Sequence, residues 1–208
     1  MRAEELMSRP VVTVTERTSV KEAARLLSEH GFTSLPVVAG DTADTGDTGD
    51  AVLKGIVTEA DLLRDRIPPG ITGERSAARQ VPPTTVGEVM TSPAVARSRK
   101  ADIAELVSVL LAEGFHAMPI VDGQRVAGIV TRRDLVRALS RDDTTIARDV
   151  RRRLMIYGGA DRWTVDVRDG VASIVDEYDD AADRHVATLL AESVPGVTSA
   201  STIHRPAD

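Results

Sequence analysis

The 208-residue chain contains no cysteine, which excludes thiolate catalysis, disulfide bonds and any metal site that needs cysteine ligands. Aromatic residues make up only 2% of the sequence, so the core must be aliphatic, and stacking platforms for single-stranded nucleic acid are scarce. The longest apolar run, near residues 106–112, is too short to cross a bilayer, and residues 1–5 do not resemble a signal peptide. We therefore expect a cytoplasmic protein.

The chain also lacks the charge and the motifs of several functional classes. Its net charge of −6 argues against a nucleic-acid partner, because phosphates would be repelled overall. No HExxH, GxSxG, P-loop or dinucleotide-binding glycine motif is present. The histidines at positions 30, 116, 185 and 204 do not have the spacing of metal ligands. We therefore expect no enzymatic activity, no metal site and no required cofactor.

What the sequence does contain is an internal repeat. Two copies share three motifs in the same order, the first two at an offset of 83 residues (90 against 7, 114 against 31) and the third at 73 (128 against 55). One motif alone is weak evidence, but three in the same order are strong. They are a Leu/Val-Met opening before proline (6–10 and 89–93), Gly-Phe-x-x-Leu/Met-Pro (31–36 and 114–119) and Gly-Ile-Val-Thr-x-x-Asp-Leu (55–62 and 128–135).

The change of offset means that the first copy carries ten more residues between Pro36 and Gly55. They coincide with the acidic, low-complexity stretch at residues 40–50, which has too few apolar residues to bury itself. We expect a solvated loop there. Calcium binding by its aspartates is the alternative, and it would require a turn that holds several oxygens around one ion.

Within each copy the hydrophobic periodicity predicts the order β-α-β-β-α. Such a unit leaves one face of its sheet uncovered, so we expect the two copies to pack as a pair in an α+β fold. The expected organisation is a first copy at residues 1–66, a linker at 67–85 and a second copy at 86–141. The expected elements are strands at 12–14, 35–38 and 53–57 with helices at 20–30 and from 59, and then strands at 118–121 and 126–130 with helices at 102–113 and 132–140.

This repeat resembles the CBS (cystathionine β-synthase) domain, in the tandem arrangement called a Bateman module. The resemblance rests on the three duplicated motifs and covers about residues 6–140. It implies a regulatory module that binds adenosine-containing ligands, such as AMP, ADP, ATP, S-adenosylmethionine or NADH, between the repeats. It also implies a flat homodimer.

In that family the Gly-h-h-Thr-x-x-Asp motif, where h is hydrophobic, binds ribose and phosphate. The matching residues are Thr58 and Asp61 in the first copy and Thr131 and Asp134 in the second. The aspartate would accept hydrogen bonds from the ribose hydroxyls, and the N–H groups of the following helix would favour phosphate. The alternative is that the threonines are only helix N-caps, followed by aspartates that suit a first turn.

The resemblance also places the adenine against apolar residues at the strand starts and the Pro segments. His116 stands in the second copy at the position of Thr33 in the first. The implied adenine contacts are Val11, Val12 and Pro36 in the first cleft, and Ala94, Val95 and Pro119 in the second.

The two clefts differ in charge. Arg132 and Arg133 stand between Thr131 and Asp134, whereas Glu59 and an alanine stand at the matching positions in the first copy. Arginine at a helix N-terminus favours an anion and glutamate opposes one. We therefore expect the second cleft to be the better phosphate site and the first to be weaker or to prefer a neutral adenosyl group. The alternative is that both arginines lie on a solvated helix face.

From residue 144 the pattern predicts a separate small domain with the order α-β-β-α-β, up to residue 205. It is similar to the BON domain, through the hairpin at Gly170-Val171, an alanine-rich helix and residues 194–197. It departs from that family at Asp176, where a glycine is usual, and at Tyr178. The resemblance implies binding to phospholipid surfaces or to proteins.

Residues 144–208 carry 8 arginines against 11 acidic residues, which does not attract an anionic lipid surface. A local basic face from arginines 148, 151, 152 and 153 is the alternative to a solvated face balanced by Asp149. We therefore favour an unknown protein partner or self-association over membrane contact. Two functions remain: a ligand sensor that relays binding through this domain, or a structural, dimerising adaptor with empty clefts.

Overall fold

The computed structural model describes residues 1–40, 51–64 and 83–205. The predicted acidic loop, with its calcium alternative, and the predicted linker lie almost wholly outside the described residues. The chain divides into two compact units, which we call the paired-sheet unit and the C-terminal unit. The paired-sheet unit comprises Met7–Ala101 and Leu106–Thr131, and the C-terminal unit comprises Met1–Leu6, Asp102–Glu105 and Arg132–Asp208.

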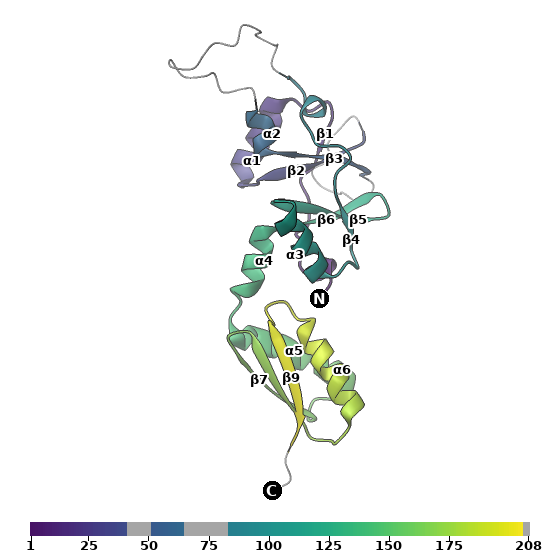
Figure 1. Cartoon of the computed structure of the whole chain (residues 1–208), viewed down its shortest axis with the longest axis vertical. Helices are drawn as coiled ribbons and strands as arrows, with labels where there is room; N and C mark the ends of the chain where they lie inside the picture. The colour runs from purple at the N-terminus through teal and green to yellow at the C-terminus, as the bar shows by residue number, and fades with distance from the viewer. Residues whose placement is uncertain (41–50, 65–82, 206–208) are drawn as a thin grey trace. The chain divides into compact units, whose positions relative to one another are not determined.

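The first copy of the repeat forms a three-stranded sheet and two helices (Figure 1). Strand β1 is parallel to β2, and β2 is antiparallel to β3. Ser19 caps the first helix by accepting a hydrogen bond from the Glu22 N–H, and Gly31 ends it in the left-handed conformation (φ 63°). The elements are β1 (Val14–Thr15), α1 (Val20–His30), β2 (Ser34–Val38), β3 (Leu53–Thr58) and α2 (Glu59–Leu63).

The second copy repeats the arrangement, with the strand order β4-β5-β6 and the same parallel and antiparallel pairings. A short 3-10 helix precedes each copy's first strand. The predicted mixed α+β class is therefore confirmed. The elements are η1 (Ala3–Glu5), η3 (Val86–Glu88), β4 (Arg97–Ser98), α3 (Ile103–Ala112), β5 (Ala117–Asp122), β6 (Arg125–Thr131) and α4 (Arg132–Leu139).

Both faces of the first sheet are buried, by different partners. One face packs against α1 and α2 in an aliphatic cluster that includes Val14, Leu35 and Val57. The other face contributes Val11 and Val38 to a second cluster, which Val126 and Ile129 of strand β6 complete. The second copy therefore covers the sheet face that the helices of the first copy leave open, as the sequence pattern predicts.

The contact between the copies is reciprocal. The opening methionine of each copy packs on the motif glycine of the other. A Cβ atom on Gly128 would lie 2.3 Å from the Met7 Sδ, and a Cβ on Gly55 would lie 2.9 Å from the Met90 Sδ and 2.6 Å from the Thr91 carbonyl oxygen. Only a residue without a side chain permits these approaches.

Backbone hydrogen bonds between the two copies are reciprocal as well. The Ser8 N–H donates to the Ile129 carbonyl at 2.8 Å, and the Thr91 N–H donates to the Ile56 carbonyl at 2.9 Å. Each opening segment thus forms an antiparallel bridge to the last strand of the other copy. The two copies are held by the same pair of contacts used twice.

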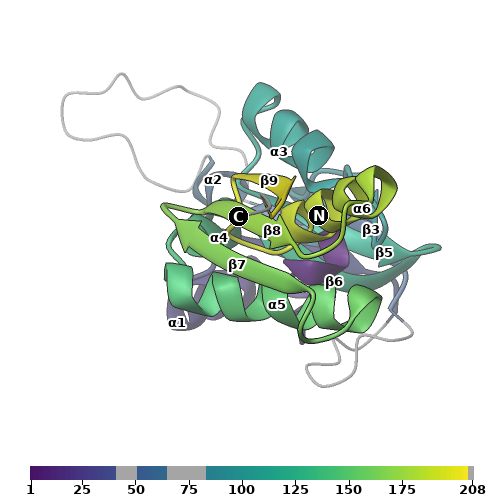
Figure 2. The same cartoon turned by 90° about the horizontal axis from the view of Figure 1, so that it is seen from below.

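The C-terminal unit contains a second type of three-stranded sheet, in the order β7-β8-β9. Helices α5 and α6 pack on one face, where Ile146, Val150, Ala187 and the strand residue Ile174 share a core (Figures 1 and 2). Among the described residues, no helix combines the length and the apolarity that a bilayer span needs. The elements are α5 (Asp143–Gly158), β7 (Trp163–Arg168), β8 (Val171–Asp176), α6 (Ala181–Glu192) and β9 (Ser199–His204).

Asp176 is fully buried at the end of β8, and Arg162 neutralises it. The Arg162 guanidinium donates to both carboxylate oxygens of Asp176, at 2.7 and 2.8 Å, and pairs with Asp183 at 2.6 Å. It also lies 4.4 Å from the ring centre of Trp163 and 5.2 Å from that of Tyr178. Hydrogen bonding to Arg162 holds the pKa of Asp176 below its ordinary value. Asp176 and Tyr178, the two residues that depart from the BON pattern, thus both contact the guanidinium of Arg162.

The reciprocal contact predicts unequal effects for its two glycines. We expect Gly55→Ala to lower the free energy of unfolding by roughly 1–3 kcal/mol, because the new Cβ meets a backbone carbonyl that bridges the copies. Gly128→Ala should destabilise less, since it meets the flexible Met7 side chain. In urea denaturation followed by circular dichroism, Met7→Ala should relieve Gly128→Ala, whereas Met90→Ala should not relieve Gly55→Ala. Equal losses with equal rescue would contradict this account.

The Arg162 pair predicts a loss of stability that depends on pH. Arg162→Leu should lower the free energy of unfolding by about 3 kcal/mol at pH 7, because it leaves a buried carboxylate unpaired. The folded-state pKa of Asp176 is depressed, so the ion pair's contribution is complete above the unfolded pKa of about 4 and disappears as pH falls through the folded value. The difference in the free energy of unfolding between Arg162→Leu and wild type should therefore become smaller below pH 4. Fluorescence of Trp163, the single tryptophan, reports the transition.

The matched control is Arg168→Leu, since Arg168 pairs with Asp166 on the surface, where both side chains are mostly exposed. Its stability should equal that of wild type at every pH. A loss of the same size in both variants would refute the buried-pair explanation.

Candidate functional site

The first candidate site lies where β3 passes into α2. The Asp61 Oδ2 accepts hydrogen bonds from the Thr58 N–H at 2.9 Å and from the Thr58 hydroxyl at 2.8 Å. The Thr58 Oγ1 in turn accepts from the Asp61 N–H at 3.2 Å. These bonds form a capping box, so the N-cap alternative describes the geometry of Thr58. Because these bonds use the Oδ2 of Asp61, only its Oδ1 is left to contact a ligand.

What remains is the second oxygen of Asp61. Its side chain is 9% exposed, and its Oδ1 lies 3.8 Å from the Arg64 Nη2. The Arg64 side chain is 71% exposed, so it can move without disturbing the capping box. A buried carboxylate oxygen with an adaptable cation beside it can accept hydrogen bonds from the hydroxyls of a sugar.

The strands bring part of the predicted first cleft together. Ser34 pairs with Thr58 and Pro36 pairs with Ile56 across β2 and β3, so these four residues share the sheet face that points away from α1. Pro36 is buried there and Thr33 is exposed beside it. Val11 lies on the same face.

Val12 does not lie with them. Its side chain packs against the cluster under α1, on the opposite face from Val11 and Pro36. Because side chains alternate along an extended segment, only one of the two neighbouring valines can face the cleft. Of the two, Val11 lies on the face of Pro36 and Thr58, and it stays the predicted contact.

The second copy places its predicted residues in the matching elements. Thr131 ends β6 and pairs with Ala117, and Pro119 pairs with Ile129. Pro119 is buried, His116 is exposed and Val95 is 43% exposed.

Asp134 lies in the first turn of α4 and is only 5% exposed. Its Oδ1 lies 3.5 Å from the Arg137 Nη1. Arg132 is half-buried and Arg133 is exposed, so the two arginines that precede Asp134 occupy different surroundings.

The sequence reasoning missed Arg64 and Arg137. Each follows its aspartate by three residues, and each forms the i, i+3 ion pair described above. The signal was present in the sequence, since Asp-Leu-Leu-Arg and Asp-Leu-Val-Arg stand at the same place in the two copies. Both aspartates therefore have a cation nearby, although only the second is preceded by two arginines.

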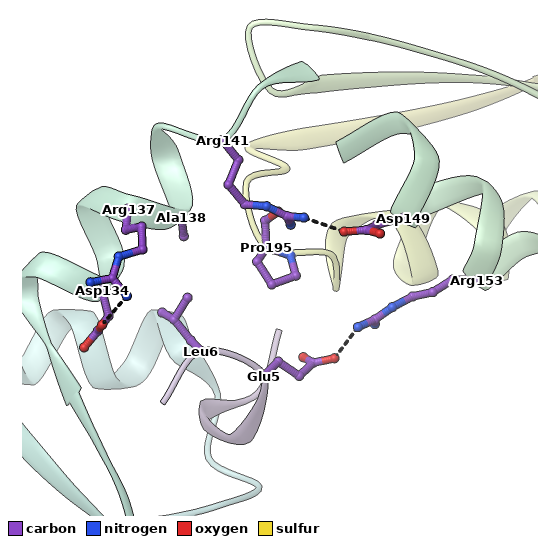
Figure 3. A pocket seen from close by; sticks show the side chains of 9 residues that line it. All are labelled: Glu5, Leu6, Asp134, Arg137, Ala138, Arg141, Asp149, Arg153 and Pro195. Carbon is purple, nitrogen blue, oxygen red and sulfur yellow. Dashed lines mark hydrogen bonds and ion pairs between the residues drawn. The ribbon is translucent and has the colours of Figure 1, made fainter. Parts of the chain in front are cut away.

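A cavity of about 560 Å³ opens beside Asp134 within the C-terminal unit (Figure 3). Arg153 pairs with Glu5 at 2.5 Å across it, and Arg141 pairs with Asp149 and donates to the Pro195 carbonyl at 2.5 Å. Its volume suits a small-molecule ligand. It is lined by Glu5, Leu6, Asp134, Arg137, Ala138, Arg141, Asp149, Arg153 and Pro195.

The described residues contain no group of three or more histidine, aspartate or glutamate side chains that could hold a metal ion.

These features define a tandem pair of small β-α-β-β-α repeats with an acidic residue at each strand-to-helix junction. The CBS domain model matches residues 3–67 and 86–141, more than half of the chain. The chain therefore belongs to the CBS domain family, and it carries two copies of the domain.

Curated relatives agree with this assignment. The chain is 27% identical over 129 residues to the CBS domain-containing protein YhcV of Bacillus subtilis, an alignment that covers 62% of the chain and 79% of YhcV. It is 28% identical over 156 residues to inosine-5'-monophosphate dehydrogenase of Methanocaldococcus jannaschii, covering 74% of the chain and 26% of that enzyme. Two further relatives, from Thermofilum pendens and M. jannaschii, are covered over only 44% and 31% of their length.

Solved structures show the same fold. CBSX2 in complex with AMP is 26% identical, with a TM-score of 0.50, and the match covers 66% of the chain and 94% of CBSX2. An uncharacterized conserved protein from Pyrococcus horikoshii has a TM-score of 0.52 at 24% identity and covers 68% of the chain. Both matches span about two thirds of the chain.

Proposed function

We propose that this protein is a regulatory sensor that binds an adenosine-containing ligand between its CBS domains and is not an enzyme. The observation that carries the proposal is the repeated strand-to-helix junction with a nearly buried aspartate, Asp61 or Asp134, and an arginine three residues later. The similarity to CBSX2, which was solved with AMP, supports an adenosyl ligand. AMP, ADP, ATP, S-adenosylmethionine and NADH are the candidates, and none is a required cofactor.

The binding chemistry follows from the first junction. The hydrogen bonds from Thr58 hold the Asp61 carboxylate in place, so its Oδ1 is positioned before a ligand arrives. That oxygen accepts from the ribose hydroxyls, and Arg64 moves from the carboxylate toward a phosphate. Pro36 and Val11 lie against the adenine, with Thr33 at the edge. In this proposal a preformed carboxylate lowers the ordering cost of binding.

The second cleft is proposed as the better phosphate site. Helix α4 has eight residues against five in α2, so its N-terminus presents a fuller set of aligned peptide dipoles. Arg132 and Arg133 precede Asp134, whereas Glu59 occupies the matching turn of the first copy. By correspondence with the first cleft, the remaining contacts in the second are Thr131, His116, Pro119 and Ala94, the counterpart of Val11, whereas Val95 is the counterpart of Val12.

The cavity beside Asp134 suggests how binding is relayed. Arg137 lies on α4, one turn after Asp134, and Arg141, in the loop after α4, holds Asp149 of α5 and the Pro195 carbonyl. A phosphate that draws Arg137 away from Asp134 changes the electrostatic interactions among the charged residues that line the cavity. The C-terminal residues 144–205, proposed as a BON-like domain, would pass the change to a protein partner. Relay requires only that the ligand bind two arrangements unequally.

The remaining features of the proposal rest on the sequence. We propose a cytoplasmic homodimer with domains at residues 1–66, 86–141 and 144–205. A membrane-surface role through the BON-like domain is disfavoured because three of the four arginines of its local basic face are engaged: Arg153 with Glu5, Arg152 with Asp149 and Arg151 with the Val165 carbonyl. The main competing function is a ligand-free structural adaptor.

A thermal-shift screen distinguishes the sensor from the adaptor. We expect at least one of AMP, ADP, ATP, S-adenosylmethionine and NADH to raise the melting temperature, because a ligand that binds only the native state stabilises it. At a hundredfold excess over Kd the stabilisation is about 2.7 kcal/mol, which is readily measured. Unchanged melting with all five would favour the adaptor.

Calorimetry on two matched variants tests the ranking of the clefts. Asp134→Ala should weaken AMP and ATP binding at least tenfold, whereas Asp61→Ala should change it less, because the phosphate-favouring groups lie in the second copy. Circular dichroism should confirm that both variants are folded. Loss of nucleotide binding in Asp61→Ala with normal binding in Asp134→Ala would reverse the assignment.

A further inference from the structure

Two buried hydroxyls in the first copy have no hydrogen-bond partner among the described residues. They are the Thr13 Oγ1 and the Ser34 Oγ, on residues that are 0% and 5% exposed. A buried hydroxyl without a partner destabilises the folded state, so such groups in native proteins call for an explanation.

Both hydroxyls lie on the face of the first sheet that carries the candidate cleft. Leu35 packs under α1, so its neighbour Ser34 points the opposite way. Val12 and Val14 also pack under α1, which places Thr13 on the other side with Val11. This is the face shared by Thr58 and Pro36.

The strand register places the two hydroxyls at the edge of the proposed adenine position. Ser34 is opposite Thr58 and two residues from Pro36. Val14 pairs with Val37 in the parallel β1–β2 pair, so Thr13, one residue earlier, runs alongside Pro36. Two unpartnered hydroxyls therefore flank the proline against which the base is proposed to lie.

The second copy has alanine at both positions. Register pairs correspond between the copies: Val14 with Val37 matches Arg97 with Ile120, and the Ser34–Thr58 pair matches Ala117–Thr131. The equivalents of Thr13 and Ser34 are therefore Ala96 and Ala117. Since the same fold forms without these hydroxyls, the fold itself does not require them.

We propose that Thr13 and Ser34 determine the specificity of the first cleft by hydrogen bonding to the polar edge of the adenine base. This inference rests on the proposed function. A hydroxyl both donates and accepts, so the pair matches an edge that combines an amino group with ring nitrogens. The second cleft, with alanines there and arginines beside Asp134, selects its ligand through phosphate instead. In this proposal the first cleft recognises the base of an adenosine-containing ligand, and the second recognises the phosphate.

The test uses adenosine, which has no phosphate, and the double variant Thr13→Val/Ser34→Ala of the whole chain. Calorimetry should show adenosine binding to the variant at least tenfold weaker, since two hydrogen bonds to the base are lost. The melting temperature of the ligand-free variant should rise, because unpaired polar groups have been removed from the interior. Opposite signs for binding and stability are the signature of a ligand-directed hydroxyl.

Thr15→Val is the matched control. Thr15 is equally buried and lies on the same segment, but its hydroxyl is 3.3 Å from the Thr18 hydroxyl. It should melt at a lower temperature and bind adenosine as wild type does. If the double variant also melts lower, or if it binds adenosine as tightly as wild type, the specificity assignment is overturned while the proposed function stands. If the wild type binds no adenosyl compound in the thermal-shift screen, the proposed function itself fails, and this assignment with it.

Discussion

The reciprocal packing of methionine on glycine is the contact on which the rest of the paired-sheet unit depends. Met7 lies against Gly128 and Met90 against Gly55, and a backbone bridge accompanies each contact. A single CBS domain leaves one sheet face open, and this exchange brings the second copy onto that face. Each glycine opens the Gly-h-h-Thr-x-x-Asp motif, so the residues that join the copies and the residues proposed to bind ligand belong to one short segment.

That segment also shows how a capping function is compatible with the proposed binding function. Thr58 and Asp61 satisfy each other in a capping box, which occupies one carboxylate oxygen and leaves the other beside Arg64. The cap holds the aspartate in one position, and the exposed arginine adds an adaptable charge. The cap and the proposed ligand contact thus use different oxygens of the Asp61 carboxylate, Oδ2 for the cap and Oδ1 for the ligand.

In the C-terminal unit the main constraint is a buried charge. Its sheet is covered by helices on one face only, and a buried carboxylate, Asp176, lies at the end of a central strand. Arg162 satisfies both oxygens of that carboxylate and lies against Trp163 and Tyr178. The cavity near Asp134 lies within this unit, where Arg141 of the loop after α4 contacts both Asp149 and Pro195.

The sequence by itself determined the duplication, the order of elements in each copy and the junction residues Thr58 and Asp61, because periodicity, caps and motif spacing are local properties. It could not decide which of Val11 and Val12 faces the cleft, since that depends on which sheet face the helices cover. The tertiary structure alone revealed the packing of methionine on glycine and the unpartnered hydroxyls of Thr13 and Ser34. These properties arise when distant segments exclude water together, and no local pattern records which polar atoms are then left without a partner.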